Sequence, residues 1–264
     1  MTDFSPGGQY CNHTYMSGSS LSPTTVEQWL SPHRFSVYTQ ETGGDSAAAL
    51  RLYSWNSAIA AACLCDIGHF EVLIRNRYAV ELDKAGNWTQ PGCPLWSTEV
   101  GMPTTREKQR KANRKSRQIL QSAIQLAPAN TPGHVIANLT FGFWAALTRP
   151  ERDATIWTPM LSNVVPGRSR GHLHDAMNKL NNFRNRLAHW EPVFSTTTGL
   201  ALRLSEFDQL FREIDPEVAY WVGSQSTVPD VIAESPLTTL AIDTSSYLRP
   251  LTPELDEAGG SHSG

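Results

Sequence analysis

Hydrophobic residues recur every three or four positions over most of the chain, whereas alternating patterns are scarce. This period is that of an amphipathic helix rather than a strand. The longest such pattern runs from Ala47 to about Lys84, contains no proline and follows a good helix N-cap at Asp45 or Ser46. It predicts one long helix, or two helices joined near Gly68. Its apolar stripe comprises Leu50, Tyr53, Ser57, Ala60, Leu64, Ile67, Phe70, Ile74 and Leu82.

Proline and glycine divide the remaining chain into shorter helices and connections. Thr24 and Glu27 have the spacing of a capping box, which predicts a short helix over residues 24–30. The connections are expected at residues 32–44, at residues 87–103, where two tryptophans indicate packing, and at residues 159–167. The other predicted helices cover residues 105–126, 133–147, 169–191 and 205–221.

The pattern as a whole predicts an all-α protein with flexible termini. We expect a single helical domain over residues 21–250, because the chain contains no long internal repeat. Residues 1–20 are polar and rich in Gly, Ser and Tyr, which predicts a flexible N-terminal arm. Residues 251–264 are rich in Gly and Ser and predict a disordered tail.

Composition and charge exclude some classes of protein. The formal net charge is −3, and 40% of the residues are hydrophobic, which suffices for a sizeable core. No stretch approaches the roughly 18 to 20 uninterrupted apolar residues that span a bilayer. We therefore exclude an integral membrane protein and expect no membrane partner. The first 20 residues lack the basic and apolar regions of a signal peptide.

The cysteines and histidines do not have the spacing of a metal site. The four cysteines form no CxxC pair, which favours reduced thiols in a cytoplasmic protein. His172 and His174 lie two apart on a predicted helix, so their side chains point in nearly opposite directions. We expect no metal ion and no cofactor.

The candidate chemistry lies at the end of the helix predicted over residues 169–191. There, Arg184 and Asn185 are followed by His189, a combination expected about 0.02 times by chance in this composition. Asn185 and His189 are four apart and share a helix face, so the amide can orient the imidazole. Arg184 is turned about 140° from His189. A two-fold pairing of such helices would gather two arginines and two histidines in one cleft.

Two other clusters carry charge. Residues 106–117 hold seven basic residues and one acid, an electrostatic footprint for phosphate backbones, although a solvated helix face is the alternative. Glu71 and Arg75 are four apart on the long helix, and either form an intrahelical salt bridge or line the same cleft as Arg184, with Asn76 beside them. The basic candidates for RNA binding are Arg106, Lys108, Arg110, Lys111, Arg114, Lys115, Arg117 and Arg186.

These motifs together resemble the HEPN superfamily, and within it the Abi-like (abortive infection) branch of bacterial proteins. The features that carry the resemblance extend from about residue 46 to residue 236. They are Leu52-Tyr-Ser-Trp-Asn56, Phe70-Glu-Val-Leu-Ile-Arg-Asn76, Phe141-Gly-Phe-Trp144, Arg184-Asn-Arg-Leu-Ala-His-Trp-Glu-Pro192 and Asp215-Pro-Glu-Val-Ala-Tyr-Trp221.

The resemblance implies an HEPN-type helical bundle with additional helices. It also implies a dimeric, metal-independent endoribonuclease that acts as a toxin or antiviral effector. Arg184, Asn185 and His189 would be its catalytic residues. RNA and a second copy of the chain would be partners, with a possible antitoxin or nucleotidyltransferase. The alternative is a non-catalytic module of the same fold that binds RNA or a protein partner. Trp190 is interpreted as a core residue rather than a platform for stacking a base.

Overall fold

The computed structural model describes residues 21–96, 103–128, 131–194, 199–238, 240 and 242–249. For Pro23 and for residues 103–106 it describes the backbone alone. The described residues contain helices, turns and loops and no strand, which confirms the all-α class. The expected flexible arm at residues 1–20 and the expected tail at residues 251–264 lie outside the described residues.

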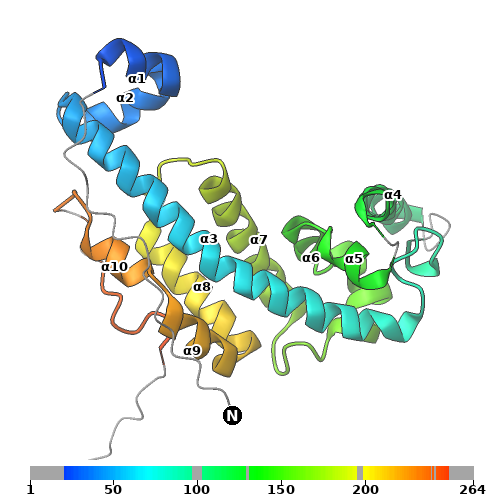
Figure 1. The fold of residues 1–264 in the computed structure, drawn as a ribbon. Coiled ribbons are helices and arrows are strands. Elements are labelled where there is room, and N and C mark those ends of the chain that lie inside the picture. The colour runs from blue at the N-terminus through cyan, green and yellow to red at the C-terminus, as the bar shows by residue number, and fades with distance from the viewer. Residues whose placement is uncertain are drawn as a thin grey trace, which may run out of the picture. The chain divides into compact units, whose positions relative to one another are not determined.

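The chain forms two compact units, one up to Ser54 and one from Trp55 onward, and the long helix α3 belongs to both (Figure 1). The α-helices of the described chain are α1 (Pro23–Leu30), α2 (Pro32–Glu41), α3 (Ser46–Leu82), α4 (Pro103–Leu126), α5 (Pro132–Ala137), α6 (Phe141–Ala146), α7 (Arg170–Ala188), α8 (Leu200–Ile214), α9 (Pro216–Gln225) and α10 (Val228–Ala233). The other helical turns are η1 (Asp83–Ala85), η2 (Pro94–Trp96), η3 (Pro150–Arg152) and η4 (Asp153–Leu161).

The first unit corrects the expectation of a loop over residues 32–44. Pro32 is the first residue of α2, where a proline has no N–H to lose, and the Ser31 hydroxyl accepts a hydrogen bond from the Arg34 N–H. The same combination begins α1, which is capped by Ser22 rather than by Thr24. A proline that follows a serine therefore begins a helix here.

The long pattern of α3 is one continuous helix and not two helices joined near Gly68. Asp45 caps it, because one carboxylate oxygen accepts the N–H groups of Ala47 and Ala48 at 2.8 and 3.0 Å. These two backbone hydrogen bonds lower the pKa of the Asp45 carboxyl.

Two of the predicted helices are each divided in the structure. The segment predicted over residues 133–147 becomes α5 and α6, with Thr140 in an extended conformation between them. The segment predicted over residues 205–221 becomes α8 and α9, because the Asp215 carboxylate caps a new helix at Pro216. The connection expected at residues 159–167 is partly helical, since η4 continues through Pro159 to Leu161.

The core of the second unit is centred on aromatic side chains. Phe70 of α3 is fully buried, and its ring lies 5.3 to 6.2 Å from the rings of Phe141, Phe207 and Phe211. Edge contacts of this kind suit the aromatic quadrupole. Helix α7 packs against both α6 and α8 (Figure 1). The two tryptophans expected to pack in the connection, Trp88 and Trp96, are both buried.

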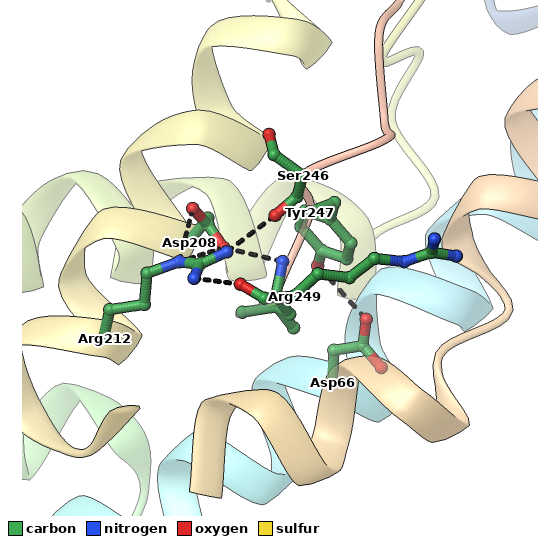
Figure 2. Close-up of polar contacts among 7 residues, drawn as sticks. Asp66, Asp208, Arg212, Ser246, Tyr247 and Arg249 are labelled. Atoms are coloured by element: carbon green, nitrogen blue, oxygen red, sulfur yellow. Dashed lines mark hydrogen bonds and ion pairs between the residues drawn. The ribbon is translucent and has the colours of Figure 1, made fainter. Parts of the chain in front are cut away.

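The C-terminal part of the described chain is fastened to α8 by a carboxylate and a guanidinium (Figure 2). Asp208 accepts the N–H of Leu248 at 2.7 Å and binds Arg212, which in turn donates to the carbonyls of Ser246 and Arg249. Backbone N–H and carbonyl groups of this irregular segment are thus hydrogen-bonded to side chains of α8.

Helix α3 is long and apolar enough to cross a membrane by length and composition alone, with a window of mean hydropathy 1.6. The expectation concerned uninterrupted apolar residues, and Arg51, Asp66 and Glu71 interrupt the apolar sequence of α3. The core helix of a soluble protein meets the same criterion. Phe70 and Asp66 on this helix are both buried, and the structure is compatible with a soluble protein.

Candidate functional site

The motif lies at the end of α7. Arg184, Asn185 and Arg186 belong to the helix, which ends at Ala188, and His189 follows it. Ser169 caps its start by accepting the His172 N–H, and His189 is its C-cap. One side of α7 is apolar, so the helix can pack with a fixed rotation about its axis. The buried residues on this side are Leu173, Met177, Leu180, Phe183 and Leu187.

A tight turn fixes the backbone directly after α7. The N–H of Trp190 donates to the carbonyl of Leu187, and the N–H of Glu191 donates to that of Arg186, both at 3.0 Å. This pair of bonds is the Schellman arrangement, in which the residue after the C-cap is left-handed and is usually glycine. Here that residue is Trp190, with φ of 56°. A bulky side chain in this conformation is strained.

Asn56 of α3 holds the same turn from the core side. It is fully buried; its side-chain oxygen accepts the Val193 N–H at 2.9 Å, and its amide donates to the Glu191 carbonyl at 3.3 Å. The buried amide thus satisfies two backbone groups on either side of Pro192. In the sequence, Asn56 stands out only as a polar residue within an apolar helical run and as part of the resemblance.

The motif arginine is joined to α3 by an ion pair. The Nε of Arg184 donates to an Oε1 of Glu71 at 3.0 Å, and both side chains are partly exposed. Of the two alternatives for Glu71, the structure therefore has the contact with α7 rather than an intrahelical salt bridge with Arg75. Glu71 and Arg184 lie 113 positions apart in the sequence and meet at the end of α7.

The neighbours of Glu71 on α3 differ in their surroundings. Arg75 is half-buried, and its Nε has no hydrogen-bond partner in the described part of the chain. Asn76 is exposed to solvent. Of the three residues expected to line a cleft, the structure thus brings Glu71 into contact with the motif and leaves Asn76 on the surface.

Asn185 and His189 lie on the exposed side of α7. The hydrogen bond between them runs from the His189 N–H to the Asn185 carbonyl at 3.0 Å, as part of the helix. The orientation of the imidazole by the Asn185 amide, expected from their spacing, stays a prediction. Both side chains remain accessible to a ligand.

Trp190 is 44% exposed, which corrects its interpretation as a core residue. The physical reason is its place in the left-handed turn after α7, outside the apolar side of that helix. Arg186 is also exposed, and it pairs with Glu191 at 3.3 Å and donates to the Pro192 carbonyl at 3.4 Å. The end of α7 therefore presents an arginine, a histidine and an indole to solvent.

The basic side chains of α4 lie on its outer side. Gln109, Asn113 and Ser116 face inward, followed by Leu120 and Ala123, at spacings of three and four. Arg117 is half-buried, and the Arg106 side chain lies outside the described residues. The exposed basic residues are Lys108, Arg110, Lys111, Arg114 and Lys115.

A buried arginine explains the polar inner face of α4. Arg152 is 1% exposed, donates to the Ser116 hydroxyl at 2.7 Å and to the Asn113 amide oxygen, and lies 5.3 Å from the ring centre of Trp96. Burial, aided by the nearby Arg149, lowers the pKa of its guanidinium to about 10. Arg152 thus fastens α4 by a hydrogen-bonded and cation–π contact.

Histidines near the start of α7 have structural partners. His172 contacts Glu213 at 2.6 Å, and Glu213 also pairs with Arg168 at 3.0 Å. His174 contacts Thr148 at 2.9 Å, and its pKa is lowered by burial and by Arg170. Within the described ranges, no three His, Cys, Asp or Glu side chains are grouped to hold a metal ion.

Comparisons of the chain with protein-family models, with curated proteins and with solved structures each give no match. Its function is therefore argued from the chemistry of its own residues.

Proposed function

We propose that this protein is a metal-independent endoribonuclease of the HEPN type, of the Abi-like branch, with its active centre at the end of α7. The observation that carries the proposal is the contact between Arg184 and Glu71, 3.0 Å apart. It holds the motif arginine at the same helix end from which His189 is exposed. A guanidinium held in place and an exposed imidazole at the same helix end are the groups needed to cleave RNA through its own 2′-OH.

In this reaction the 2′-oxygen of a ribose attacks the adjacent phosphorus and the bond from phosphorus to the 5′-oxygen breaks. His189 takes the proton from the 2′-OH or gives one to the departing 5′-oxygen. Arg184 stabilises the negative charge that accumulates on the phosphoryl oxygens, through its planar donor fork. The products are a 2′,3′-cyclic phosphate and a 5′-OH.

The assembly that suits this chemistry is a homodimer, because two copies of α7 supply two histidines, one as base and one as acid. The exposed basic residues of α4 would attract the phosphate backbone without reading its sequence. We further propose that the protein acts in the cytoplasm as a toxin or antiviral effector, held silent by an antitoxin or a nucleotidyltransferase.

One observation favours a second function. The exposed basic side chains of α4 form a site that can bind a phosphate backbone without any chemistry at the end of α7. Such a site suits a module that binds RNA or a protein partner without cleaving it.

The two functions are separated by incubating the purified protein with total RNA and with tRNA in the presence of EDTA. If the protein is an endoribonuclease, the wild type should cleave the RNA and leave cyclic phosphate ends, and His189→Ala should not cleave it. His33→Ala is the matched control, because His33 is also exposed but lies on α2. Binding of RNA with no cleavage by the folded wild type would favour the second function. Cleavage that persists in His189→Ala, or that EDTA abolishes, would refute the first.

A further inference from the structure

Trp190 combines two features that are rare together: a left-handed backbone and an exposed indole. It occupies the left-handed position after the C-cap, with φ of 56°, where glycine or asparagine is usual. Yet Trp190 is 44% exposed, so complete burial of the indole does not offset this strain. A strained residue of this kind that the surroundings hold in place points to a role outside the fold.

The surroundings of Trp190 fix its backbone on both sides. Its own N–H donates to Leu187, the next N–H donates to Arg186, and the Glu191 carbonyl accepts from the buried Asn56 amide. These hydrogen bonds therefore fix the backbone that carries the indole. It places the ring one residue from His189, on the exposed end of α7.

We propose that Trp190 is the platform on which a nucleobase of single-stranded RNA stacks, next to the phosphate that faces His189. This inference rests on the proposed function and names its substrate as unpaired RNA. Aromatic faces recognise RNA in this way because the bases of loops and single strands are free to splay out. A stacked base would hold the ribose and its phosphate in register with the reacting groups. Trp190 is thus a substrate-binding residue, and Arg184 and His189 supply the chemistry.

The experiment measures the affinity of a short, labelled single-stranded RNA for the protein in the His189→Ala background, in which cleavage cannot remove the probe. Three substitutions separate stacking from packing. Trp190→Phe keeps an aromatic face, Trp190→Leu keeps apolar bulk without one, and Trp190→Gly removes both and relieves the left-handed strain. We expect Phe to bind within a few-fold of the parent. Leu and Gly should bind about 5- to 100-fold more weakly, the usual loss of one base–aromatic stack.

A second measurement varies the RNA and compares the response of the His189→Ala parent with that of the same protein carrying Trp190→Leu. One abasic ribose is moved along the RNA, and binding is measured at each position. With Trp190 present, one position should lose affinity, and with Trp190→Leu the same position should become neutral, because the partner of that base is gone.

The possible results distinguish failure of the stacking proposal from failure of the proposed function. If Leu, Gly and Phe bind as tightly as the parent, or if no abasic position is sensitive, the stacking proposal is overturned while the proposed function stands. If neither the wild type nor His189→Ala binds or cleaves any RNA, both are overturned. A fall in melting temperature in Trp190→Phe as large as in Trp190→Gly, with unchanged affinity, would assign the indole to packing alone.

Discussion

The buried side chain of Asn56 joins the long helix α3 to the chain that leaves the candidate site, through its 2.9 Å hydrogen bond with the Val193 N–H. The same amide donates to the Glu191 carbonyl, so a single residue completes the backbone hydrogen bonding on both sides of Pro192. The position of the turn that carries Trp190 therefore depends on α3 as well as on α7.

Replacing Asn56 by alanine should destabilise the protein and loosen this turn. The Val193 N–H and the Glu191 carbonyl would both lose their Asn56 partner, and the first of these hydrogen bonds is buried. The expected cost is about 1–3 kcal/mol in the free energy of unfolding. Urea denaturation followed by circular dichroism measures the loss. Hydrogen exchange at the Val193 N–H should accelerate more than that of the α7 interior.

Asn76→Ala is the matched control, because Asn76 lies on the same helix but is exposed. It should change the unfolding free energy by less than about 0.5 kcal/mol. Equal effects of the two substitutions would contradict the role assigned to Asn56.

The ion pair between Glu71 and Arg184 should matter more for activity than for stability. Both side chains are partly exposed, so breaking the pair should cost no more than about 1 kcal/mol. Glu71→Gln keeps an acceptor but removes the charge that orients the guanidinium. We expect kcat/KM for RNA cleavage to fall about 10- to 100-fold, because a misplaced catalytic group is costly.

Glu206→Gln is the control for this prediction. Glu206 also pairs with a residue of α7, Lys179 at 2.8 Å, and with Arg203, but away from the motif. Its loss should leave cleavage unchanged. A fall in stability of several kcal/mol in Glu71→Gln, with cleavage retained, would make the contact structural.

Long periodic segments could be predicted from the sequence, and the junctions between short helices could not. Helices α3 and α7 extend over many turns, so their apolar spacing outweighs local exceptions. Helix α2 was not predicted, because a proline such as Pro32 usually ends a helix. Here the serine before it caps a new helix that begins at Pro32. In α9 the same ambiguity arises at Pro216, where the Asp215 cap decides.

The candidate site was predictable in its motif and not in its contacts. The spacing from Arg184 to His189 is local, and the sequence displays it directly. The partner of Arg184 lies 113 positions away and that of Val193 lies 137 away, and no local pattern reports such separations. Trp190 was misjudged because its exposure follows from a left-handed turn, whereas its residue type favours burial.

The buried Asp66 should make stability depend on pH. Its carboxyl accepts the Ser226 hydroxyl at 2.6 Å and the Tyr247 hydroxyl at 3.1 Å (Figure 2 shows the second). Burial raises its pKa, although both hydrogen bonds and His69 oppose the shift. The unfolded chain ionises first, near pH 4. The contribution of Asp66 to stability therefore declines as the pH rises from about 4 through the raised value in the folded chain.

Asp66→Asn should remove this dependence. Both hydroxyls donate to the same carboxylate oxygen, so an asparagine oxygen can accept both without a charge to bury. Relative to the wild type, the variant should gain stability between pH 4 and 7, measured by urea denaturation at each pH. Asp66→Ala should lose about 1–3 kcal/mol, because the two hydroxyls lose their acceptor. A flat difference between wild type and Asp66→Asn across this range would refute the prediction.

Gly223 of α9 has no room for a side chain. A Cβ added there would lie 2.1 Å from the carbonyl oxygen of Leu248, so the backbone of the C-terminal segment itself would have to move. We expect Gly223→Ala to destabilise the protein by about 1–3 kcal/mol. The displaced segment should lose the hydrogen bond from the Leu248 N–H to Asp208, so exchange at that amide and chymotryptic cleavage after Tyr247 should both accelerate.

Gly68→Ala tests whether this loss comes from the clash rather than from removing a glycine. Gly68 lies within α3, and a Cβ there would meet nothing within 4 Å. Because alanine favours the helix over glycine, this variant should be more stable by about 0.5–1 kcal/mol. The two substitutions are chemically identical, so opposite signs in the unfolding free energy would assign the loss to the contact between α9 and the C-terminal segment. If Gly223→Ala gained stability as well, the segment would be free to leave α9 at little cost.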